Sequence, residues 1–234
     1  EALSKRINSL PVSATLAMAA KARELKNQGI DIIGLSLGEP DFNTPEFIKQ
    51  AAIQAVNDNW NSYSPVDCYA DLKEAICEKF KRDNKLSYQP SQIVVSTGAK
   101  QSIANVCMVL LDPGDEVLLP APYWVSYSAI ATLAEAKSII IPSSIETDFK
   151  ITPEQLEAAI TPRTKLIMFN SPNNPSGTIY TEDEYRALGK VLERYPDIYI
   201  LSDEIYEHIN YGTPLTQQVL EPSQGKSDHF LGLL

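Results

Sequence analysis

Four loops of this chain carry polar or aromatic residues directly after short apolar runs. They comprise residues 96–100, 120–124, 170–177 and 202–206. Ligands collect at the carboxyl ends of parallel strands, so such loops are where a binding site is expected. In the first loop, Gly98 lets the backbone approach an anion, and the helix that starts there offers free N–H groups. Taken alone, however, this loop is more simply explained as a helix cap.

The second and third loops add a flat surface and side-chain amides. Two prolines stiffen residues 120–124 and present Tyr123 or Trp124, whose ring could stack on a planar heterocycle, although a lone tryptophan is more often a core residue. The run Asn-Ser-Pro-Asn-Asn-Pro-Ser-Gly at 170–177 is the most specific stretch of the chain. An asparagine amide both donates and accepts, which suits a phenolic oxygen beside a carboxylate. An Asx turn is the structural alternative for Asn173, but it explains the whole run less well.

The fourth loop places a carboxylate at the end of a predicted buried strand. Burial of Asp203 is costly unless a cationic partner lies opposite it. A protonated pyridine nitrogen would be such a partner, and Tyr206 could donate to an oxygen on the same ring. A helix cap is the simpler alternative for Asp203. Each loop is ambiguous alone, but the four together, in this order, are not.

The elements that must hold these loops alternate between helix and apolar strand. Strands are predicted at 32–37, 93–95, 116–119, 138–142, 166–170 and 198–202, and helices at 15–27, 72–84, 100–111, 152–160 and 181–193. A further helix is expected after Thr44 as N-cap, with Pro45 at its first position. Continuous apolar strands separated by helices predict an α/β fold, in which a mainly parallel sheet is covered by helices on both faces.

Composition argues against several classes of partner. The formal charge is −10 and no basic cluster is present, so neither a nucleic acid nor an anionic membrane is expected. The longest apolar runs are far shorter than the ~20 residues that span a bilayer. The first ten residues lack the apolar core of a secretory signal. Three cysteines without CxxC spacing predict a reduced, cytoplasmic chain with no zinc site and no disulfide framework.

The motifs resemble those of the class I, fold type I pyridoxal-phosphate-dependent aminotransferases, most closely the bacterial aspartate aminotransferase branch. Besides the four loops, the matching text is Gly-Glu-Pro-Asp-Phe at 38–42 and Tyr-Ser-Pro at 63–65. The resemblance implies the cofactor pyridoxal 5'-phosphate and transfer of an amino group from an amino acid to a 2-oxo acid. It also implies an arm and part of a small domain at 1–45, an incomplete cofactor-binding large domain at 46–214, and an atypical tail at 215–234.

The resemblance further implies how the cofactor is held. The backbone of Gly98 and Ala99, with Lys100 nearby, would bind its phosphate. Trp124 would stack on the pyridine ring and border the substrate. Asp203 would pair with the pyridine N–H and so make the ring a better electron sink.

Four more residues receive roles on the same grounds. Asn174 would bind the ring hydroxyl oxygen of the cofactor and the substrate carboxylate, and Tyr206 would donate to the same ring oxygen. Gly38 would line the substrate carboxylate. Tyr63 would reach the phosphate bound to the neighbouring subunit of a homodimer. We therefore expect a dimer or a larger assembly, with low thermal stability.

Two departures from the family pattern affect these expectations. Cys68 stands where many relatives carry a glycine, so a positive φ there would be strained. In relatives, the Asp-Glu-x-Tyr motif is followed by a loop, a strand and the Schiff-base lysine, whereas residues 215–234 do not resemble that loop and strand. Lys226 follows Pro-Ser-Gln-Gly and is expected to be a solvated residue. With no Schiff-base lysine, and hence no catalytic residue assigned, the chain as given should transaminate little or not at all.

Two other functions fit the same motifs. A pyridoxal-phosphate-dependent carbon–sulfur lyase or an enzyme like aminocyclopropane-carboxylate synthase shares the Asn-Pro-x-Gly and Asp-x-x-Tyr patterns. A non-catalytic ligand-binding module is favoured by the lack of a suitable lysine after Tyr206. The side-chain preference for the amino acid is not predicted by these motifs.

Overall fold

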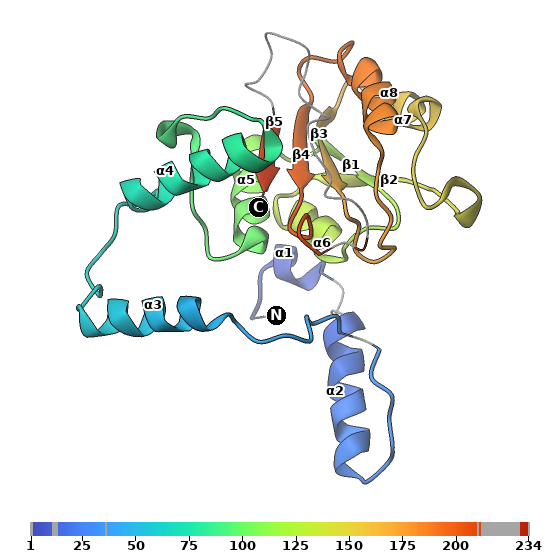
Figure 1. Ribbon diagram of the computed structural model, residues 1–234. Coiled ribbons are helices and arrows are strands. Elements are labelled where there is room, and N and C mark those ends of the chain that lie inside the picture. The colour runs from blue at the N-terminus through green and yellow to red at the C-terminus, as the bar shows by residue number, and fades with distance from the viewer. Residues whose placement is uncertain (1, 11–13, 36, 210, 212–229, 234) are drawn as a thin grey trace. The chain divides into compact units, whose positions relative to one another are not determined.

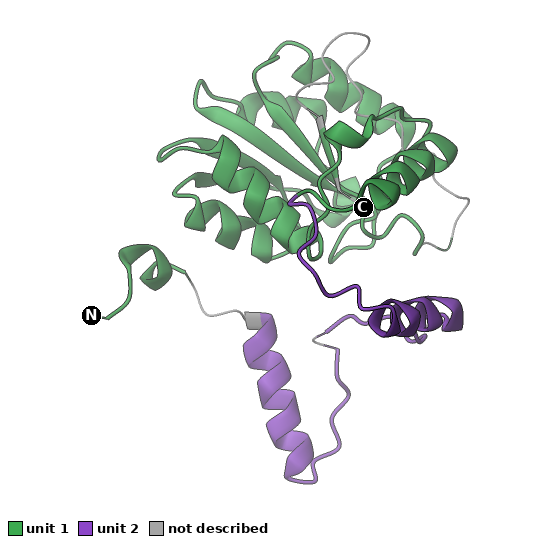
Figure 2. Ribbon diagram, turned by 90° about the vertical axis from the view of Figure 1, so that its left-hand side faces the viewer, with its two compact units in different colours: residues 1–10, 67–234 green, residues 11–66 purple. Residues whose placement is uncertain are grey.

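A computed structural model describes residues 2–10, 14–35, 37–209, 211 and 230–233 (Figure 1). The chain divides into two compact units, Glu1–Leu10 with Asp67–Leu234, and Pro11–Val66 (Figure 2). The predicted division into residues 1–45, 46–214 and 215–234 stays a prediction. Among the described residues, no helix has the length and apolar character needed to cross a membrane.

The larger unit is built on a parallel sheet. Its strands are β1 (Glu116–Pro120), β2 (Lys137–Ile141), β3 (Thr164–Asn170), β4 (Tyr199–Asp203) and β5 (Phe230–Leu233), in the spatial order β2-β1-β3-β4-β5. Every neighbouring pair is parallel, which confirms the predicted fold class. Residues 230–233, expected to belong to an atypical tail without a strand, instead pair with β4. That expectation was wrong because four residues carry too little local pattern to indicate a strand.

Helices cover both faces of this sheet (Figure 1). They are α5 (Ala99–Leu110), α6 (Ser126–Leu133), α7 (Pro153–Ala159) and α8 (Glu182–Leu192). Successive strand residues enter opposite cores, as the two-residue period of a strand requires. One core holds Val117, Leu119, Leu166, Met168 and Leu201 with residues of α5 and α6, and the other holds Leu118, Ile167, Phe169 and Ile200 with residues of α7 and α8.

Local sequence signals fix the ends of two helices. α7 and α8 each begin with a capping box, in which Thr152 pairs with Gln155 and Thr181 with Glu184. Each box satisfies two backbone donors at a helix start, which explains why both helices begin within one residue of their predicted starts. α6 was not predicted at all.

The segment before α5 differs from its prediction. The expected helix at 72–84 is α4 (Ala70–Lys79) followed by a π-helix, η1 (Phe80–Asn84), which ends at Lys85 with φ +60°. A 3-10 turn, η2 (Pro90–Gln92), leads into residues 93–95. The strand predicted at 93–95 is wrong for this structure: the backbone of Ile93 is extended, but residues 93–95 belong to no strand of the described sheet. Cys68 has φ +87°, a backbone conformation that strains any residue with a Cβ.

Short elements complete the two units. In the larger unit these are α1 (Lys5–Asn8) and the 3-10 turn η3 (Ile145–Thr147). The smaller unit contains α2 (Ala14–Asn27) and α3 (Glu46–Asn57), and Pro45 rather than Thr44 is the N-cap of α3. Residues 32–35 and 37 form no strand, contrary to prediction, and Ser36 lies outside the described residues. Their apolar side chains are mostly exposed, so no partner strand makes a ladder favourable there.

Candidate functional site

The third and fourth polar loops meet where β3 and β4 end. Asn170 and Asp203 are register partners at the carboxyl ends of these strands. The Asn170 amide donates to the Asp203 carbonyl (2.9 Å), and its oxygen accepts from the Asn174 N–H (2.7 Å). Asn170 therefore folds the loop at 170–177 back onto the end of β4. As a result the Asn174 amide lies 3.3 Å from the Tyr206 hydroxyl, to which it donates.

The Asn173 side chain bonds within its own loop and to the second loop, whereas the Asn174 side chain bonds to Tyr206. The Asn173 side-chain oxygen accepts from the Ser176 N–H (3.1 Å) and hydroxyl (2.7 Å), so its acceptor bonds the backbone three residues on, one residue further than in the Asx turn considered for this position. Its amide donates to the Pro122 carbonyl (3.2 Å), so it joins the third loop to the second. The peptide bonds before Pro122, Pro172 and Pro175 are cis.

Asp203 is the most unusual residue of the site. It is only 3% exposed. It accepts hydrogen bonds from the Tyr127 hydroxyl (2.6 Å) and the Ile205 N–H (3.2 Å), both of them neutral donors. Within the described part of the chain no Lys, Arg or His side chain forms an ion pair with it. Burial raises its pKa, and the two hydrogen bonds oppose that shift only in part.

Tyr127 supports Asp203 and was missed in the sequence. Its side chain is 1% exposed and sits near the start of α6, a helix that was not predicted. Burial is the largest cause that raises the pKa of the Tyr127 hydroxyl, and the negative charge of Asp203 raises that pKa further. The hydroxyl therefore stays protonated and donates to Asp203. Its position three residues after Trp124, one turn along a helix, is the only signal in the sequence that could have indicated it.

The first and second loops approach each other through Lys100 and Trp124. The Trp124 ring packs edge-on against Tyr127, with centroids 5.7 Å apart. The Lys100 ammonium lies 4.9 Å from the Trp124 centroid, a cation–π distance. Gly98 has φ +85°, and a Cβ added there would meet nothing within 4 Å, so backbone conformation rather than crowding favours glycine. Ala99 and Lys100 start α5, where helix amides have no acceptor in a preceding turn.

A second polar cluster anchors the turn that carries Tyr206. Glu207 accepts hydrogen bonds from Lys79 of α4 and from Asn84 at the end of η1 (3.1 Å to the latter). The Glu207 N–H donates to the Glu204 carbonyl (2.9 Å), and the Ser202 hydroxyl donates to the Glu204 carboxylate (2.7 Å). None of these supporting residues was predicted. The contacts of Lys79 and Asn84 with Glu207 join segments more than 120 residues apart, whereas those of Ser202 and Glu204 are local.

Seven of the nine predicted site residues lie in the larger unit. Contacts lead from Lys100 through Trp124 and Tyr127 to Asp203, and from Asn170 beside it to Asn174 and Tyr206. Gly98 and Ala99 adjoin Lys100 in the chain. Gly38 and the exposed Tyr63 belong to the smaller unit, and Lys226 lies outside the described residues.

Replacement of Tyr127 by phenylalanine is expected to destabilise the chain by about 1.5–3 kcal/mol at pH 8, because a buried carboxylate loses a charge-assisted hydrogen bond. Urea unfolding at pH 8 measures the change. Phenylalanine at the exposed Tyr211 is the control and should change stability by less than about 0.5 kcal/mol. In a double-mutant cycle, the cost of Tyr127→Phe should fall to about 0.5–1.5 kcal/mol once Asp203 is asparagine, because the amide oxygen still accepts but carries no charge. An undiminished cost would mean that ring packing, not the hydrogen bond, matters.

Comparison with known proteins agrees with this geometry. The sequence profile of the family "Aminotransferase class I and II" matches residues 30–231. The chain is 53% identical to an aspartate/prephenate aminotransferase of Nitrosomonas europaea over 207 residues, which is 88% of this chain and 52% of that protein. It is 51% identical to an aspartate aminotransferase of Bacillus subtilis over 210 residues, 90% of this chain and 53% of that protein.

Solved structures give the same result. An aspartate aminotransferase from Rhizobium meliloti superposes with a TM-score of 0.93 at 45% identity, over 98% of this chain and 57% of that one. The aspartate aminotransferase of Thermus thermophilus with maleate gives 0.91 at 40% identity, over 99% and 59%. The chain thus spans about half the length of the curated relatives it matches. The chain belongs to the class I and II aminotransferase family.

Proposed function

We propose that the complete protein is a pyridoxal-phosphate-dependent aminotransferase of the aspartate aminotransferase type, which moves an amino group from an amino acid to a 2-oxo acid. The observation that carries this proposal is Asp203: a buried carboxylate at a strand end, held by two neutral donors and without a described cationic partner. Such a group is costly unless a cation binds against it, and a protonated pyridine nitrogen is a cation of suitable shape and charge.

The other residues of the site suit the remaining parts of the cofactor. The amides of Ala99 and Lys100 at the start of α5, next to Gly98, suit a phosphate. The Trp124 ring suits a stacked pyridine. The Asn174 amide and the Tyr206 hydroxyl already point to each other and could share a ring oxygen between them. Asn174 would also hold the substrate carboxylate, together with Gly38.

Each of these residues has a definite part in the chemistry. Bound pyridoxal phosphate supplies an electron sink for negative charge that develops at the α-carbon of an amino acid. Asp203 would hold a proton on the pyridine nitrogen, and Tyr127 keeps the Asp203 carboxylate in position for it. Trp124 would stack against the ring. A lysine that accepts the α-proton is not assigned among these 234 residues, so this chain by itself should transaminate little or not at all.

The relatives support a substrate class, an assembly and a compartment as further parts of the proposal. Those named above are aspartate or aspartate/prephenate aminotransferases, so we take aspartate as the candidate amino donor. A homodimer, with Tyr63 reaching the phosphate of the neighbouring subunit, and a cytoplasmic location remain predictions. The rival function, that of a carbon–sulfur lyase or an enzyme like aminocyclopropane-carboxylate synthase, would use the same residues, but none of the relatives named above is an enzyme of either kind.

Quenching of Trp124 fluorescence tests the cofactor site directly. The chain has two tryptophans, so Trp60→Phe leaves Trp124 as the single reporter. Pyridoxamine 5'-phosphate is the probe, because it has no aldehyde that could react with surface lysines. We expect saturable quenching, since a stacked pyridine would lie against the indole, and binding at least tenfold weaker for pyridoxamine without the phosphate.

A matched variant separates stacking from non-specific absorption. The Trp124→Phe chain, which keeps Trp60, should show no saturable quenching at the same probe concentrations. Equal, non-saturating quenching of both single-tryptophan chains would contradict the cofactor proposal.

A further inference from the structure

A buried polar cluster joins the turn that carries Tyr206 to a helix end distant in sequence. The Lys79 ammonium donates to the Asn84 side-chain oxygen (2.9 Å) and to the Glu207 carboxylate. The Asn84 amide donates to the same carboxylate (3.1 Å), from which the largely exposed His208 lies 3.3 Å away. Asn84 is 1% exposed, and the side chains of Lys79 and Glu207 are 18% and 10% exposed. Lys79, Asn84 and Glu207 thus bond to one another largely away from water, and they are called the anchor cluster below.

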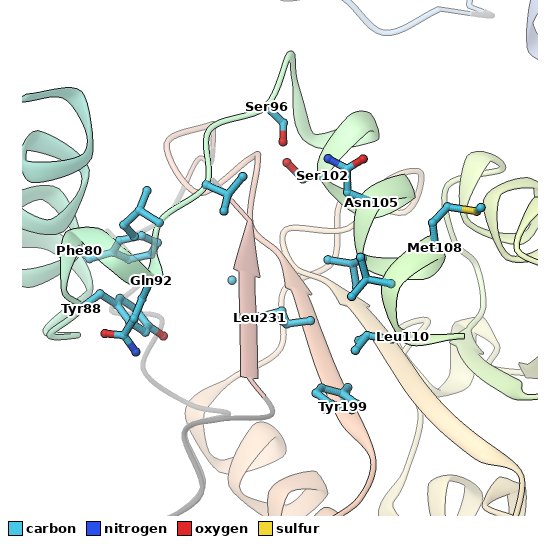
Figure 3. Close-up of a pocket in the computed structure, with 15 residues that line it drawn as sticks. Phe80, Tyr88, Gln92, Ser96, Ser102, Asn105, Met108, Leu110, Tyr199 and Leu231 are labelled. Carbon is cyan, nitrogen blue, oxygen red and sulfur yellow. The ribbon is translucent and has the colours of Figure 1, made fainter. Parts of the chain in front are cut away.

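The π-helix η1 brings the first two members of the anchor cluster together. A π-helix bonds residue i to residue i+5, so it places Lys79 and Asn84, five residues apart, close to each other. An α-helix would instead bring together residues three or four apart. η1 is also fixed by apolar packing, because Phe80 is 7% exposed and its ring packs edge-on against Tyr88, with centroids 5.1 Å apart (Figure 3). The polar pair therefore meets Glu207 from a rigid base.

The position of the Tyr206 hydroxyl depends mainly on where its turn lies. The Asn174 amide is 3.3 Å from this hydroxyl, just beyond the range of about 2.7–3.2 Å that is usual for an N–H···O bond. The turn itself is closed more tightly. The Ile209 N–H donates to the Tyr206 carbonyl (2.8 Å), and the Glu207 N–H donates to the Glu204 carbonyl (2.9 Å). Glu207, next to Tyr206 in the chain, is the side chain that ties this turn to α4 and η1.

We propose that Lys79, Asn84 and Glu207 are positioning residues for the Tyr206 hydroxyl, which they hold where it can donate to the ring oxygen of the cofactor. A buried ion pair is weak evidence of a contribution to stability, because loss of hydration offsets the attraction of the two charges. Directed hydrogen bonds, in contrast, fix one arrangement of the turn. The inference rests on the cofactor site proposed above and adds residues that act on the cofactor through another side chain.

An apolar replacement of the whole cluster separates positioning from stability. The cluster variant carries Lys79→Met, Asn84→Leu and Glu207→Met, which keep the side chains close to their original size and leave no unpaired buried charge. Replacements of this kind are often neutral or stabilising, so we expect a urea midpoint no lower than that of the parent chain. The turn nevertheless loses its directed bonds. Hydrogen exchange measured by mass spectrometry, without ligand, should be at least fivefold faster in peptides that cover residues 204–209.

Two probes measure the effect on the ring oxygen itself. They are pyridoxamine 5'-phosphate and its analogue without the ring hydroxyl, each titrated by Trp124 fluorescence in the Trp60→Phe background. The parent chain should bind the first about tenfold more tightly, because the analogue leaves the donors without their acceptor. In the cluster variant this ratio of Kd values should be about fivefold smaller and equal to that of Tyr206→Phe. Addition of Tyr206→Phe to the cluster variant should then change the ratio no further.

Lys73→Met is the matched control, because Lys73 also belongs to α4 and loses an ion pair, with an aspartate, Asp67, that is 47% exposed. It should leave both the ratio and the exchange at residues 204–209 within twofold of the parent chain.

Four results would overturn the positioning role. They are an unchanged ratio in the cluster variant, an equal loss of affinity for both probes, unchanged exchange at residues 204–209, and a much lower urea midpoint, which would show that the cluster serves stability. A parent chain that binds neither probe saturably would contradict the proposed function, and with it the cofactor contact of Tyr206. The exchange measurement, which uses no ligand, would then still show whether the cluster holds the turn.

Discussion

Replacement of Asp203 by asparagine is expected to weaken binding of pyridoxamine 5'-phosphate about 100-fold. Removal of one member of a buried charge pair costs about 2–5 kcal/mol, and each 1.4 kcal/mol is a tenfold change in Kd. The measurement is the fluorescence titration in the Trp60→Phe background. Asp197→Asn is the matched control, because Asp197 is an exposed aspartate just before the other end of β4. A Kd for Asp203→Asn within threefold of the parent chain would contradict the assignment of Asp203 to the pyridine nitrogen.

The same substitution, which weakens ligand binding, is expected to leave the unliganded folded chain at least as stable as the parent at pH 8. Burial raises the pKa of Asp203 above its ordinary value of 3.8, so the folded chain binds more protons than the unfolded chain over the interval between the two pKa values. Stability therefore falls as pH rises through that interval, and asparagine removes this loss. At pH 8, without ligand, Asp203→Asn should be at least as stable as the parent chain. Lower stability of the variant would mean that the charge itself is stabilising without a ligand.

The central part of the fold follows from local sequence. β1, β3 and β4 are continuous apolar runs, and α7 and α8 carry capping boxes, so these elements are visible without tertiary information. Residues 93–95 and 230–233 show the limit of that approach. The first has strand composition but no described neighbour, and the second pairs with β4 despite a weak pattern. Pairing is decided by segments distant in sequence, which single-segment propensity does not report.

The residues of the site likewise divide into those that the sequence could predict and those that it could not. Asp203 and Asn174 were predictable because a carboxylate and an amide directly after buried strands call for a partner. Tyr127 was not, because its helix begins immediately after a proline-rich loop and lacks a side-chain cap. Lys100 was expected near a phosphate, and the structure places its ammonium over the Trp124 ring, a contact that no sequence pattern indicates.

Glu204 adds a proton-binding group next to Asp203. Burial raises its pKa to about 7, the Ser202 hydroxyl and the charge of Lys79 oppose the shift, and the carboxylates of Glu207 and Asp203 add to it. Tyr185 of α8 also faces it, and the charge of Glu204 adds to the rise in the pKa of that hydroxyl. Lys79 forms an ion pair with Glu207, so its positive charge offsets the rise in the pKa of Glu204 only in part. The ionised form of Glu204 is therefore disfavoured in the folded chain.

Replacement of Glu204 by glutamine is expected to stabilise the chain by about 3 kcal/mol at pH 8 and to leave it nearly unchanged at pH 4.5. A pKa raised from 4.5 to about 7 means that the folded chain holds a proton that the unfolded chain releases, so stability is lost as pH rises across that interval. Glutamine keeps an acceptor for the Ser202 hydroxyl but carries no charge. Urea unfolding at pH 4.5, 6 and 8 measures the difference between the two chains, with Glu74→Gln, an exposed residue of α4, as control. A pH-independent difference would show that the pKa of Glu204 is the same in the folded and unfolded chains, and would contradict the effect of burial on this carboxyl.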